Sequence, residues 1–454
     1  MGGAYHRTTP IPRVMSQDRQ SPAPSSRRRF LKTSSAAMAA GTLASTLPFP
    51  NATFGAPISR KLKVGLVGCG GRGTGAAAQA MEADSNVELW ALGDVFEDQI
   101  TKSLNTLEKQ MGADGNGDKL NVKARKFVGW DAIDQVIDSG CDVVLLATTP
   151  HFRPQQLRKV IEAGRHCFAE KPVAVDAPGV RSVLETTEMA KRKGVSIVSG
   201  LCWRYETGMQ EVMRRIHEGA IGDIVSLEST RYGRGVSKLA KRQPGWTDME
   251  YQMRNWYYYT WLSGDFIVEM FVHELDKMAW LMNGEYPERC IASGGRIART
   301  GPDYGHVFDH FNATFDYASG AKYYAQTRHE PNTDGLWRDH AHGTNGWCDM
   351  MKFTLYDKKG NPTDRLAKKR TNMHQLEHNE MYAALRRGEI INNGEYMAKS
   401  TMMAIMARMS AYTGRSLTWD QAMNSKEDLS PPSYAWDQSL SEPPVAKPGV
   451  TKFI

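Results

Sequence analysis

Lys63-Val64-Gly65-Leu66-Val67-Gly68-Cys69-Gly70-Gly71-Arg72-Gly73 is the stretch that decides the fold of this chain. A short apolar run ends in a GxGxxG element, and an Ala-rich segment that predicts a helix over 74–83 follows it. Glycines at these positions allow a tight turn and let a pyrophosphate approach the backbone at a helix N-terminus. The stretch therefore predicts a dinucleotide-binding loop. Its predicted cofactor-binding residues are Gly68, Gly70, Arg72 and Gly73.

A carboxylate follows the second apolar run at the spacing that this fold requires. Asp94 lies 21 residues after Gly73 and just beyond the run 87–92. A carboxylate there accepts hydrogen bonds from the adenosine ribose hydroxyls and repels a 2′-phosphate. The alternative role for Asp94 is that of a helix N-cap. The paired signals predict NAD, rather than NADP, as the cofactor.

The chain divides into two structural regimes near residue 200. Before it, apolar runs at 142–148 and 166–170 alternate with helical segments at 96–111, 153–164 and 177–193, which is typical of βαβ units with a parallel sheet. After it come a helix over 207–219, a long aromatic loop over 234–260 and one apolar helix over 264–282. Segments 289–298, 307–317 and 321–329 alternate in polarity as antiparallel strands do, and helices over 375–387 and 396–413 follow.

These patterns predict an α/β chain with a Rossmann doubly wound parallel sheet, followed by an α+β domain with a largely antiparallel sheet. Four segments result. They are a signal and linker (1–58), an NAD-binding domain (59–182), a substrate-binding domain (183–430) and a Pro-rich tail that drapes over the surface (431–454).

The basic charge of the chain is confined to residues 1–60, which carry eight basic side chains and one acidic side chain. The remaining residues carry 49 of each sign, so no nucleic-acid partner is expected. The stretch 26–32, Ser-Arg-Arg-Arg-Phe-Leu-Lys, resembles a twin-arginine export signal, with cleavage after Ala44 or after Gly55. We therefore expect export through the twin-arginine machinery, to the periplasm or otherwise out of the cytoplasm, without a stable membrane span.

Six cysteines show neither a CxxC pair nor the spacing of a metal site. Because the twin-arginine route exports proteins that have already folded in a reducing cytoplasm, we expect buried free thiols rather than disulfides.

Two further motifs, Thr149-Pro150 and Glu170-Lys171-Pro172, end successive predicted strands, where an α/β sheet places its ligands. Together with the glycine element and Asp94, in this order, they resemble the Gfo/Idh/MocA oxidoreductase family, which includes glucose–fructose oxidoreductase and inositol dehydrogenase. The resemblance extends through Trp203-Arg204-Tyr205 and His273-Glu274-Leu275-Asp276 to about residue 414. It implies that Thr149, Pro150, Glu170 and Lys171 belong to the cofactor site.

The resemblance also implies the catalytic residues. Lys171 would lie beside the nicotinamide and the substrate, and the family's helix histidine falls on His273. Oxidation of a sugar hydroxyl sends a hydride to nicotinamide and a proton to a base, and a desolvated lysine or a histidine suits that proton transfer. Glu269 precedes His273 by one helical turn, so its carboxylate could orient the imidazole. Without the resemblance, His273 would be interpreted as a hydrogen-bonded core histidine.

Two positions depart from the family pattern. Glu269 stands where the family usually has Asp, and Pro154 stands where a histidine is common, although His151 lies nearby.

The substrate site is predicted from the resemblance and from an aromatic segment, 246–261. Aromatic faces there could stack on sugar rings, or they could pack at a domain or subunit interface. A homo-oligomer is therefore possible. The predicted substrate contacts are Arg204, Tyr205, Asn255, Trp256 and Asp276.

The histidine pairs His306/His310 and His374/His378 have a spacing that could bind a metal on a helix, but neither belongs to a recognisable metal motif. We predict no catalytic metal.

The leading functional hypothesis is an exported NAD-dependent oxidoreductase that acts on a sugar or sugar derivative with a tightly bound cofactor. An NAD-dependent glycoside hydrolase is an alternative within the same fold. Such an enzyme transiently oxidises a sugar hydroxyl, breaks the glycosidic bond by elimination and then returns the hydride. A nucleotide-bound sensor without turnover is the non-enzymatic alternative, and the presence of both Lys171 and His273 argues against it.

Overall fold

The computed structural model describes residues 53–54, 57–235 and 239–454. The predicted export signal and both of its candidate cleavage sites lie outside these residues. Within the described part of the chain, no helix is both long and apolar enough to cross a membrane. All six cysteines are buried free thiols, which confirms the prediction made for them.

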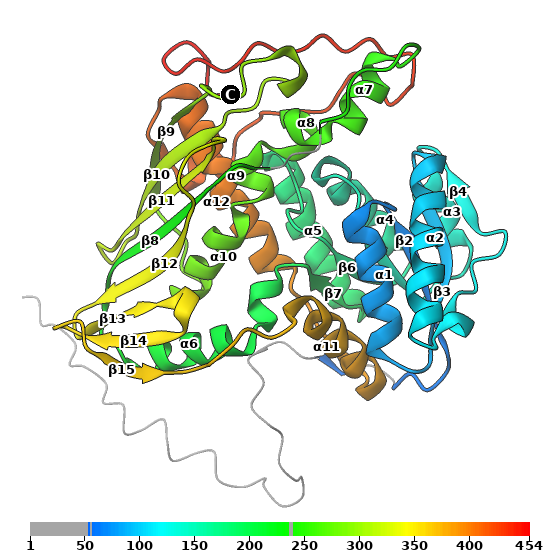
Figure 1. Ribbon diagram of the computed structural model, residues 1–454, viewed down its shortest axis with the longest axis horizontal. Coiled ribbons are helices and arrows are strands. Elements are labelled where there is room, and N and C mark those ends of the chain that lie inside the picture. Colours follow the sequence, from blue (N-terminus) through cyan, green and yellow to red (C-terminus); the bar gives the residue numbers. More distant parts are fainter. Residues whose placement is uncertain (1–52, 55–56, 236–238) are drawn as a thin grey trace, which may run out of the picture. The chain divides into compact units, whose positions relative to one another are not determined.

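A six-stranded parallel sheet forms the first domain, in the order β4-β3-β2-β5-β6-β7 (Figure 1). Its strands are β2 (Leu62–Val67), β3 (Val87–Asp94), β4 (Lys126–Val128), β5 (Val143–Leu146), β6 (His166–Ala169) and β7 (Ile197–Ser199). Its helices are α1 (Gly71–Ala83), α2 (Glu97–Ala113), α3 (Ala132–Asp138), α4 (Arg153–Glu162) and α5 (Ala177–Lys193). This is the Rossmann arrangement that the sequence predicts.

Helices cover both faces of this sheet because successive side chains of a strand point to opposite faces. In β5, Val143 and Leu145 join the hydrophobic cluster of α1 and α2, whereas Val144 and Leu146 join that of α3, α4 and α5. Helix α5 begins where the Asp176 carboxylate accepts a hydrogen bond from the Gly179 amide at 2.8 Å, and it ends at Gly194 in the left-handed conformation.

A nine-stranded sheet forms the second domain, in the order β15-β14-β13-β12-β8-β11-β10-β9-β17, with only β8 and β11 parallel. Its strands are β8 (Ile224–Gly233), β9 (Arg289–Gly295), β10 (His310–Asp316), β11 (Lys322–His329), β12 (Leu336–Gly343), β13 (Gly346–Asp349), β14 (Thr354–Asp357), β15 (Pro362–Arg365) and β17 (Leu417–Thr418). Strands β1 (Thr53–Phe54) and β16 (Glu389–Ile390) form a separate antiparallel pair.

The helices of the second half pack against this sheet and against the first domain. They are α6 (Thr207–His217), α7 (Asp248–Arg254), α8 (Thr260–Ser263), α9 (Phe266–Glu269), α10 (Val272–Leu281), α11 (Met373–Arg387), α12 (Gly394–Thr413) and α13 (Trp419–Met423). Helix α12 is buried on nearly all sides, between α5, α10 and β9, and α11 returns to pack against α1 (Figure 1). The predicted largely antiparallel second domain is confirmed.

Two predicted segments are wrong, and the parallel sheet does not end at the predicted domain boundary. Helix α5 runs across residue 182, and β7 belongs to the parallel sheet, so this sheet extends to residue 199. The segment 234–260 is not all loop, because α7 lies within it. The single helix predicted over 264–282 is broken into α9 and α10 at Met270 and Phe271. The sequence reasoning also missed β8 and the strands β12 to β15.

Candidate cofactor and active site

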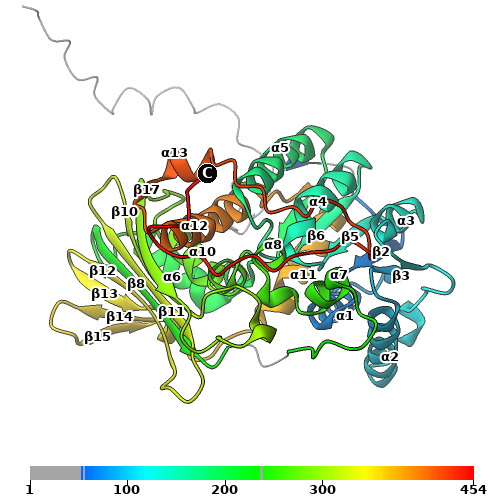
Figure 2. The same ribbon diagram turned by 90° about the horizontal axis from the view of Figure 1, so that it is seen from above.

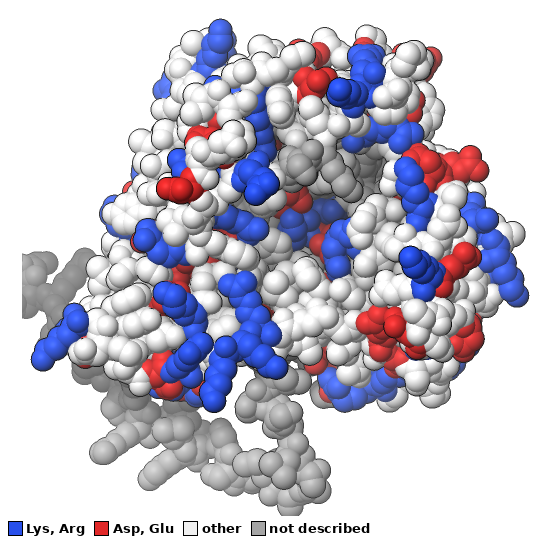
Figure 3. All heavy atoms as spheres, viewed as in Figure 1, with Lys and Arg blue, Asp and Glu red and all other residues white. Residues whose placement is uncertain are grey.

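A cavity of about 1190 Å³ lies where the carboxyl ends of the parallel strands face the second domain. The first domain contributes the glycine loop, Asp94 and Thr149, and the second domain contributes the aromatic segment and residues of α9 and α10. Figure 3 shows this side of the molecule hollowed near its centre, with charged side chains of both signs inside the hollow.

The glycines of the loop after β2 have two roles. Gly68 and Gly73 allow close packing of the backbone, whereas Gly70 and Gly71 leave an open space that we call the glycine cradle. A Cβ atom on Gly68, whose φ is +95°, would meet the backbone of Ala147 and Thr148 at 2.5 Å, and one on Gly73 would lie 1.9 Å from the Gly68 carbonyl oxygen. Gly70 and Gly71 line the cavity, and a Cβ on either would meet nothing within 4 Å.

The cradle lies at the start of α1, where the N-cap residue is Gly70 and offers no side-chain acceptor to the first amides of the helix. Unpaired amides at a helix N-terminus favour a bound phosphate. This loop therefore fits a dinucleotide pyrophosphate.

Asp94 lines the cavity and is tied to the same loop. Its Oδ2 accepts a hydrogen bond from the Cys69 amide at 2.6 Å, and its Oδ1 accepts one from the Phe96 amide at 2.9 Å. The N-cap of α2 is Phe96, so Asp94 does not have the alternative N-cap role. Burial raises the pKa of the Asp94 carboxyl. Each carboxylate oxygen keeps a second lone pair, which can accept a ribose hydroxyl.

We expect Asp94→Ala to weaken NAD binding about tenfold and to narrow the preference for NAD over NADP, because a charge-assisted hydrogen bond contributes about 1.5–3 kcal/mol. Titration of both nucleotides into cofactor-free protein gives the two dissociation constants. Asp131→Ala, an exposed aspartate outside the cavity, is the control and should leave both constants unchanged. A wild-type protein that prefers NADP would show that the role assigned to Asp94 is wrong.

Of the other predicted cofactor residues, some line the cavity and others lie outside its wall. Thr149 lines the cavity, and its buried hydroxyl has no hydrogen-bond partner among the described residues, so it is free to bond a ligand. Pro150 is buried and begins a short 3₁₀ turn. The predicted direct role of Arg72 and Glu170 needs correction. Their side chains pair with each other, and Arg72 reaches Glu377 of α11 at 3.3 Å, so they brace the loop from behind.

Lys171 and Glu269 meet at the other end of the cavity. The Lys171 ammonium donates to the Glu269 backbone oxygen at 2.5 Å and to its carboxylate at 3.0 Å. In an unbroken helix that backbone oxygen would accept from the amide of residue 273. The ammonium group takes its place at the break between α9 and α10.

The predicted contact between Glu269 and the His273 imidazole is therefore wrong, since the carboxylate pairs with Lys171. His273 still lines the cavity, and its buried Nδ1 has no hydrogen-bond partner in the described part of the chain. Burial and the nearby cations Lys171 and Arg231 lower the pKa of His273 well below its ordinary value. The imidazole is neutral at neutral pH and able to bond a ligand.

Two cavity residues were missed from the sequence. The buried hydroxyl of Tyr257 has no partner within the described ranges, and Tyr257 lines the same cavity as His273 and Lys171. Arg231, from the unpredicted strand β8, also lines the cavity and donates to Glu274 at 2.9 Å. The position of Tyr257 in the aromatic segment 246–261 was the only sequence feature that pointed to a place in the cavity. No sequence feature pointed to such a place for Arg231.

Two of the five predicted substrate residues, Asn255 and Trp256, line the cavity. The amide group of Asn255 is already engaged with the backbone of Ala240, donating and accepting at 2.7 Å each. Asn255 therefore positions the loop before α7, and Trp256 remains the better candidate for a substrate contact.

The other three are not part of the cavity wall formed by the described residues. Arg204 forms a buried, two-pronged ion pair with Asp276, at 2.8 and 3.0 Å, and Asp276 also accepts from Ser400 at 2.8 Å. The Tyr205 hydroxyl donates to Asn393 at 3.0 Å. Their predicted role in substrate binding is corrected to a structural one, in which they hold the segment 204–205 against α10 and α12.

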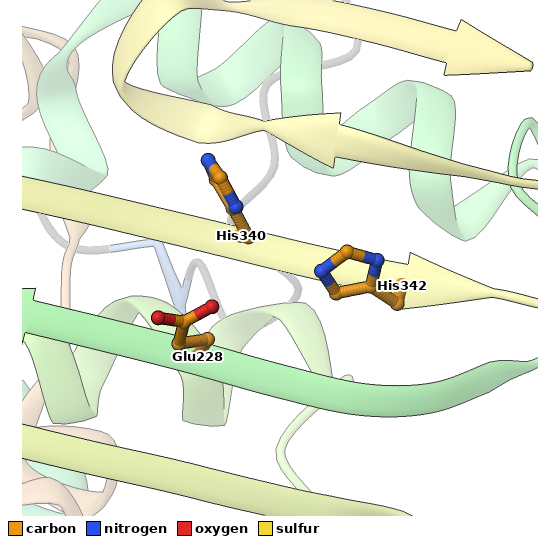
Figure 4. Close-up of side chains that lie close together, drawn as sticks. All are labelled: Glu228, His340 and His342. Atoms are coloured by element: carbon orange, nitrogen blue, oxygen red, sulfur yellow. The ribbon is translucent and has the colours of Figure 1, made fainter. Parts of the chain in front are cut away.

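Two groups of potential metal ligands occur among the described residues, and both lie outside the cavity. Glu228, His340 and His342 share one face of β8 and β12 (Figure 4), and Asp309, His310 and Glu330 form the other group. Arg338 donates to the Glu228 carboxylate, so a cation there would compete with a guanidinium. The absence of a catalytic metal stays a prediction.

Comparisons with known proteins agree with this geometry. A family model described as "Oxidoreductase family, NAD-binding Rossmann fold" matches residues 62–200, and one described as "GFO/IDH/MocA C-terminal domain" matches residues 209–348. The chain belongs to the Gfo/Idh/MocA family of oxidoreductases. Its first domain is the NAD-binding domain of that family, which confirms the predicted cofactor.

Curated Gfo/Idh/MocA relatives match at low identity. The 2,7-anhydro-N-acetylneuraminate hydratase of Escherichia coli K12 is 26% identical over 206 residues, which cover 45% of this chain and 50% of the relative. The inositol 2-dehydrogenase of Salmonella typhimurium LT2 is 24% identical over 225 residues, which cover 50% and 56%. The chain thus spans about half the length of the curated relatives it matches.

Solved structures with the Gfo/Idh/MocA fold match more of the chain. An aldose-aldose oxidoreductase from Caulobacter crescentus superposes with a TM-score of 0.61 at 18% identity, over 79% of this chain and all of that one. GenD2 from gentamicin A biosynthesis, solved in complex with NAD, gives 0.60 at 16% identity, over 80% and 98%. At these identities the likeness shows the fold alone.

Proposed function

We propose that this protein oxidises a hydroxyl group of a sugar or sugar derivative with NAD held in the cavity, and that it restores the NAD within each catalytic cycle. One observation carries the proposal. Lys171, His273 and Tyr257 converge in the same cavity as the open glycine cradle and Asp94. A cofactor site and a cluster of proton-handling groups are what hydride transfer from an alcohol requires.

When bound, NAD supplies the hydride acceptor, and the protein must handle the proton and the developing charge. The Lys171 ammonium, fixed by two hydrogen bonds to Glu269, offers a positive charge to an oxygen that is losing its proton. The neutral imidazole of His273 can accept that proton at its unpaired Nδ1. The Tyr257 hydroxyl, also unpaired among the described residues, can orient the substrate.

Two relatives support chemistry without net redox change. One relative is named as a hydratase, although the family is one of oxidoreductases. Hydration of a substrate involves no net oxidation or reduction. A fold neighbour is named aldose-aldose oxidoreductase, a name that pairs two aldoses in one oxidoreduction. We extend this type of cycle to the present chain as part of the proposal.

Export is the second part of the proposal and rests on the twin-arginine stretch 26–32. Free NAD is scarce outside the cytoplasm, so an exported enzyme cannot exchange its cofactor at every turnover. The twin-arginine route carries folded proteins, so NAD can be loaded before export and kept. A retained cofactor must be restored in each cycle, which requires binding at about the micromolar level or tighter.

We therefore expect the purified protein to carry nucleotide and to act on sugars without added NAD. The test releases and identifies any bound nucleotide, and then follows nicotinamide absorbance while a panel of sugars and aryl glycosides is added. Dialysed protein that is nucleotide-free, and turns over only with stoichiometric NAD, would contradict the redox-neutral cycle.

The same experiment separates the competing chemistries. Cleavage of an aryl glycoside without a net absorbance change would identify the oxidising, eliminating and reducing glycosidase. Product formation from a pair of sugars would identify coupled half-reactions. No response to any sugar would favour the nucleotide-bound sensor.

A further inference from the structure

The C-terminal tail is a closed loop that is anchored to the body of the protein at its base. The backbone amide of Lys426 donates to the Ile454 carbonyl oxygen at 3.2 Å, so the two ends of the segment 426–454 meet. The Leu429 amide donates to the Asp176 carboxylate at 3.1 Å. Figure 2 shows the segment as the red trace that runs from α13 across to the first domain and back.

The far part of this loop rests on the first domain through two aromatic residues. The Tyr434 hydroxyl lies 2.7 Å from Nε2 of His151. The ring of Trp436 lies 4.9 Å from that of Trp130 and 5.5 Å from that of Phe96, centroid to centroid. Beyond them, the Leu440 carbonyl oxygen accepts a hydrogen bond from Gln252 of α7 at 3.4 Å, so the loop contacts both domains.

These contacts fall on the cofactor cavity itself. Phe96, Trp130 and Tyr434 all line it, and Phe96 is the residue whose amide binds the Asp94 carboxylate. The buried indole nitrogen of Trp130 has no hydrogen-bond partner within the described part of the chain. The tail therefore completes the wall of the cavity on the side of Asp94, where the spacing of Asp94 from the glycine loop predicts the adenosine ribose.

We propose that the segment Tyr434–Trp436 is part of the cofactor site and retains NAD, so that this segment must lift away before NAD leaves. The inference deepens the proposed function, because it gives the retained cofactor a physical cause. The packing of Trp436 against the rings of Trp130 and Phe96, and the hydrogen bond between Tyr434 and His151, are the interactions that lifting breaks. A bound cofactor adds its own contacts to the same aromatic wall.

The test measures the rate at which NAD leaves full-length protein. Protein loaded with NAD is mixed with an excess of a fluorescent NAD analogue, and exchange is followed over time. We expect Trp436→Ala to speed NAD release about tenfold or more, and Tyr434→Phe, which removes only the hydroxyl group, to have a smaller effect. Val450→Ala, at a position 72% exposed in the same tail, is the matched control and should exchange at the wild-type rate.

A second measurement covers the case in which Trp436→Ala does not fold. Backbone hydrogen exchange over residues 433–438 of the wild-type protein should be slower with NAD bound than without it. A folded Trp436→Ala variant that releases NAD at the wild-type rate, or equal hydrogen exchange in the two states, would overturn the proposal.

The tail proposal and the proposed function fail in different experiments. Failure of the wild-type protein to act on any sugar would refute the function and leave the release rates informative. Equal release rates would refute the role of the tail and leave the sugar assays unaffected.

Discussion

Lys171→Ala is expected to lower the turnover number by about 10²-fold or more while the protein still folds and binds NAD. The substitution removes the ammonium group that lies 2.5 Å from the Glu269 backbone oxygen and 3.0 Å from its carboxylate, and with it the positive charge offered to the substrate oxygen. Steady-state kinetics on the best substrate of the sugar panel, with nucleotide content measured in parallel, gives the effect.

Lys191→Ala is the matched control for loss of a lysine. Lys191 lies on the exposed side of α5, where it pairs with Glu188, and it does not line the cavity. Its replacement should leave turnover unchanged. Full activity in Lys171→Ala would remove that residue from the mechanism.

His273→Ala should lower turnover by a similar factor, and the pH profile tests the protonation state assigned to the imidazole. Because burial and nearby cations hold the pKa of His273 well below 6.5, the side chain stays neutral as the pH falls from 8 to 6. Turnover should therefore not decline over that range through protonation of His273. An acid limb near pH 6.5 that is present in wild type and lost in His273→Gln would contradict this assignment.

Gly70→Val is expected to weaken NAD binding by about 10²-fold with little change in the fold. Gly70 has φ −69° and ψ −177°, which any residue can adopt, and an added Cβ would meet nothing within 4 Å. The new side chain would instead occupy the cradle where a pyrophosphate must approach the helix N-terminus. Loss of charge-assisted hydrogen bonds of about 1.5–3 kcal/mol each accounts for an effect of this size.

Gly112→Val is the control for adding a side chain in open space. A Cβ on Gly112, in α2, also meets nothing within 4 Å, and this glycine does not line the cavity. Titration calorimetry and thermal unfolding of both variants separate binding from stability. Gly70→Val lacks a favoured N-cap residue, which costs about 1 kcal/mol at most. Normal NAD affinity in Gly70→Val would show that the cofactor does not lie in this cradle.

The proximity of the glycine loop and Asp94 could be predicted because it depends on short stretches of sequence. The glycine loop and Asp94 each follow a buried strand, and a parallel sheet brings the carboxyl ends of adjacent strands to one edge. Their proximity follows from strand order alone, and the amide of Cys69 does bind the Asp94 carboxylate. Local periodicity also predicted α5 to the residue, because a capping aspartate and a terminal glycine mark its ends.

The parts that were predicted wrongly depend on partners far apart in the chain. Glu269 was expected to support His273, four residues away, but it pairs with Lys171, 98 residues away. Arg204 was expected to face the substrate, but it is buried against Asp276, 72 residues away. A spacing rule presupposes an unbroken helix, whereas α9 ends at Glu269 and the backbone oxygen of Glu269 accepts a hydrogen bond from Lys171.

The sequence by itself determined that strands and helices alternate in the first half of the chain, where the dinucleotide loop lies, and which residue types are available for proton transfer. Each of these features is encoded within one or two neighbouring elements. Only the tertiary structure decided which of those residues share the cavity and which brace it from behind. It also decided that Tyr434, 283 residues after His151, closes the cofactor wall. The physical reason is that packing selects each side chain's partner by position in space, and position in space depends on how the whole chain folds.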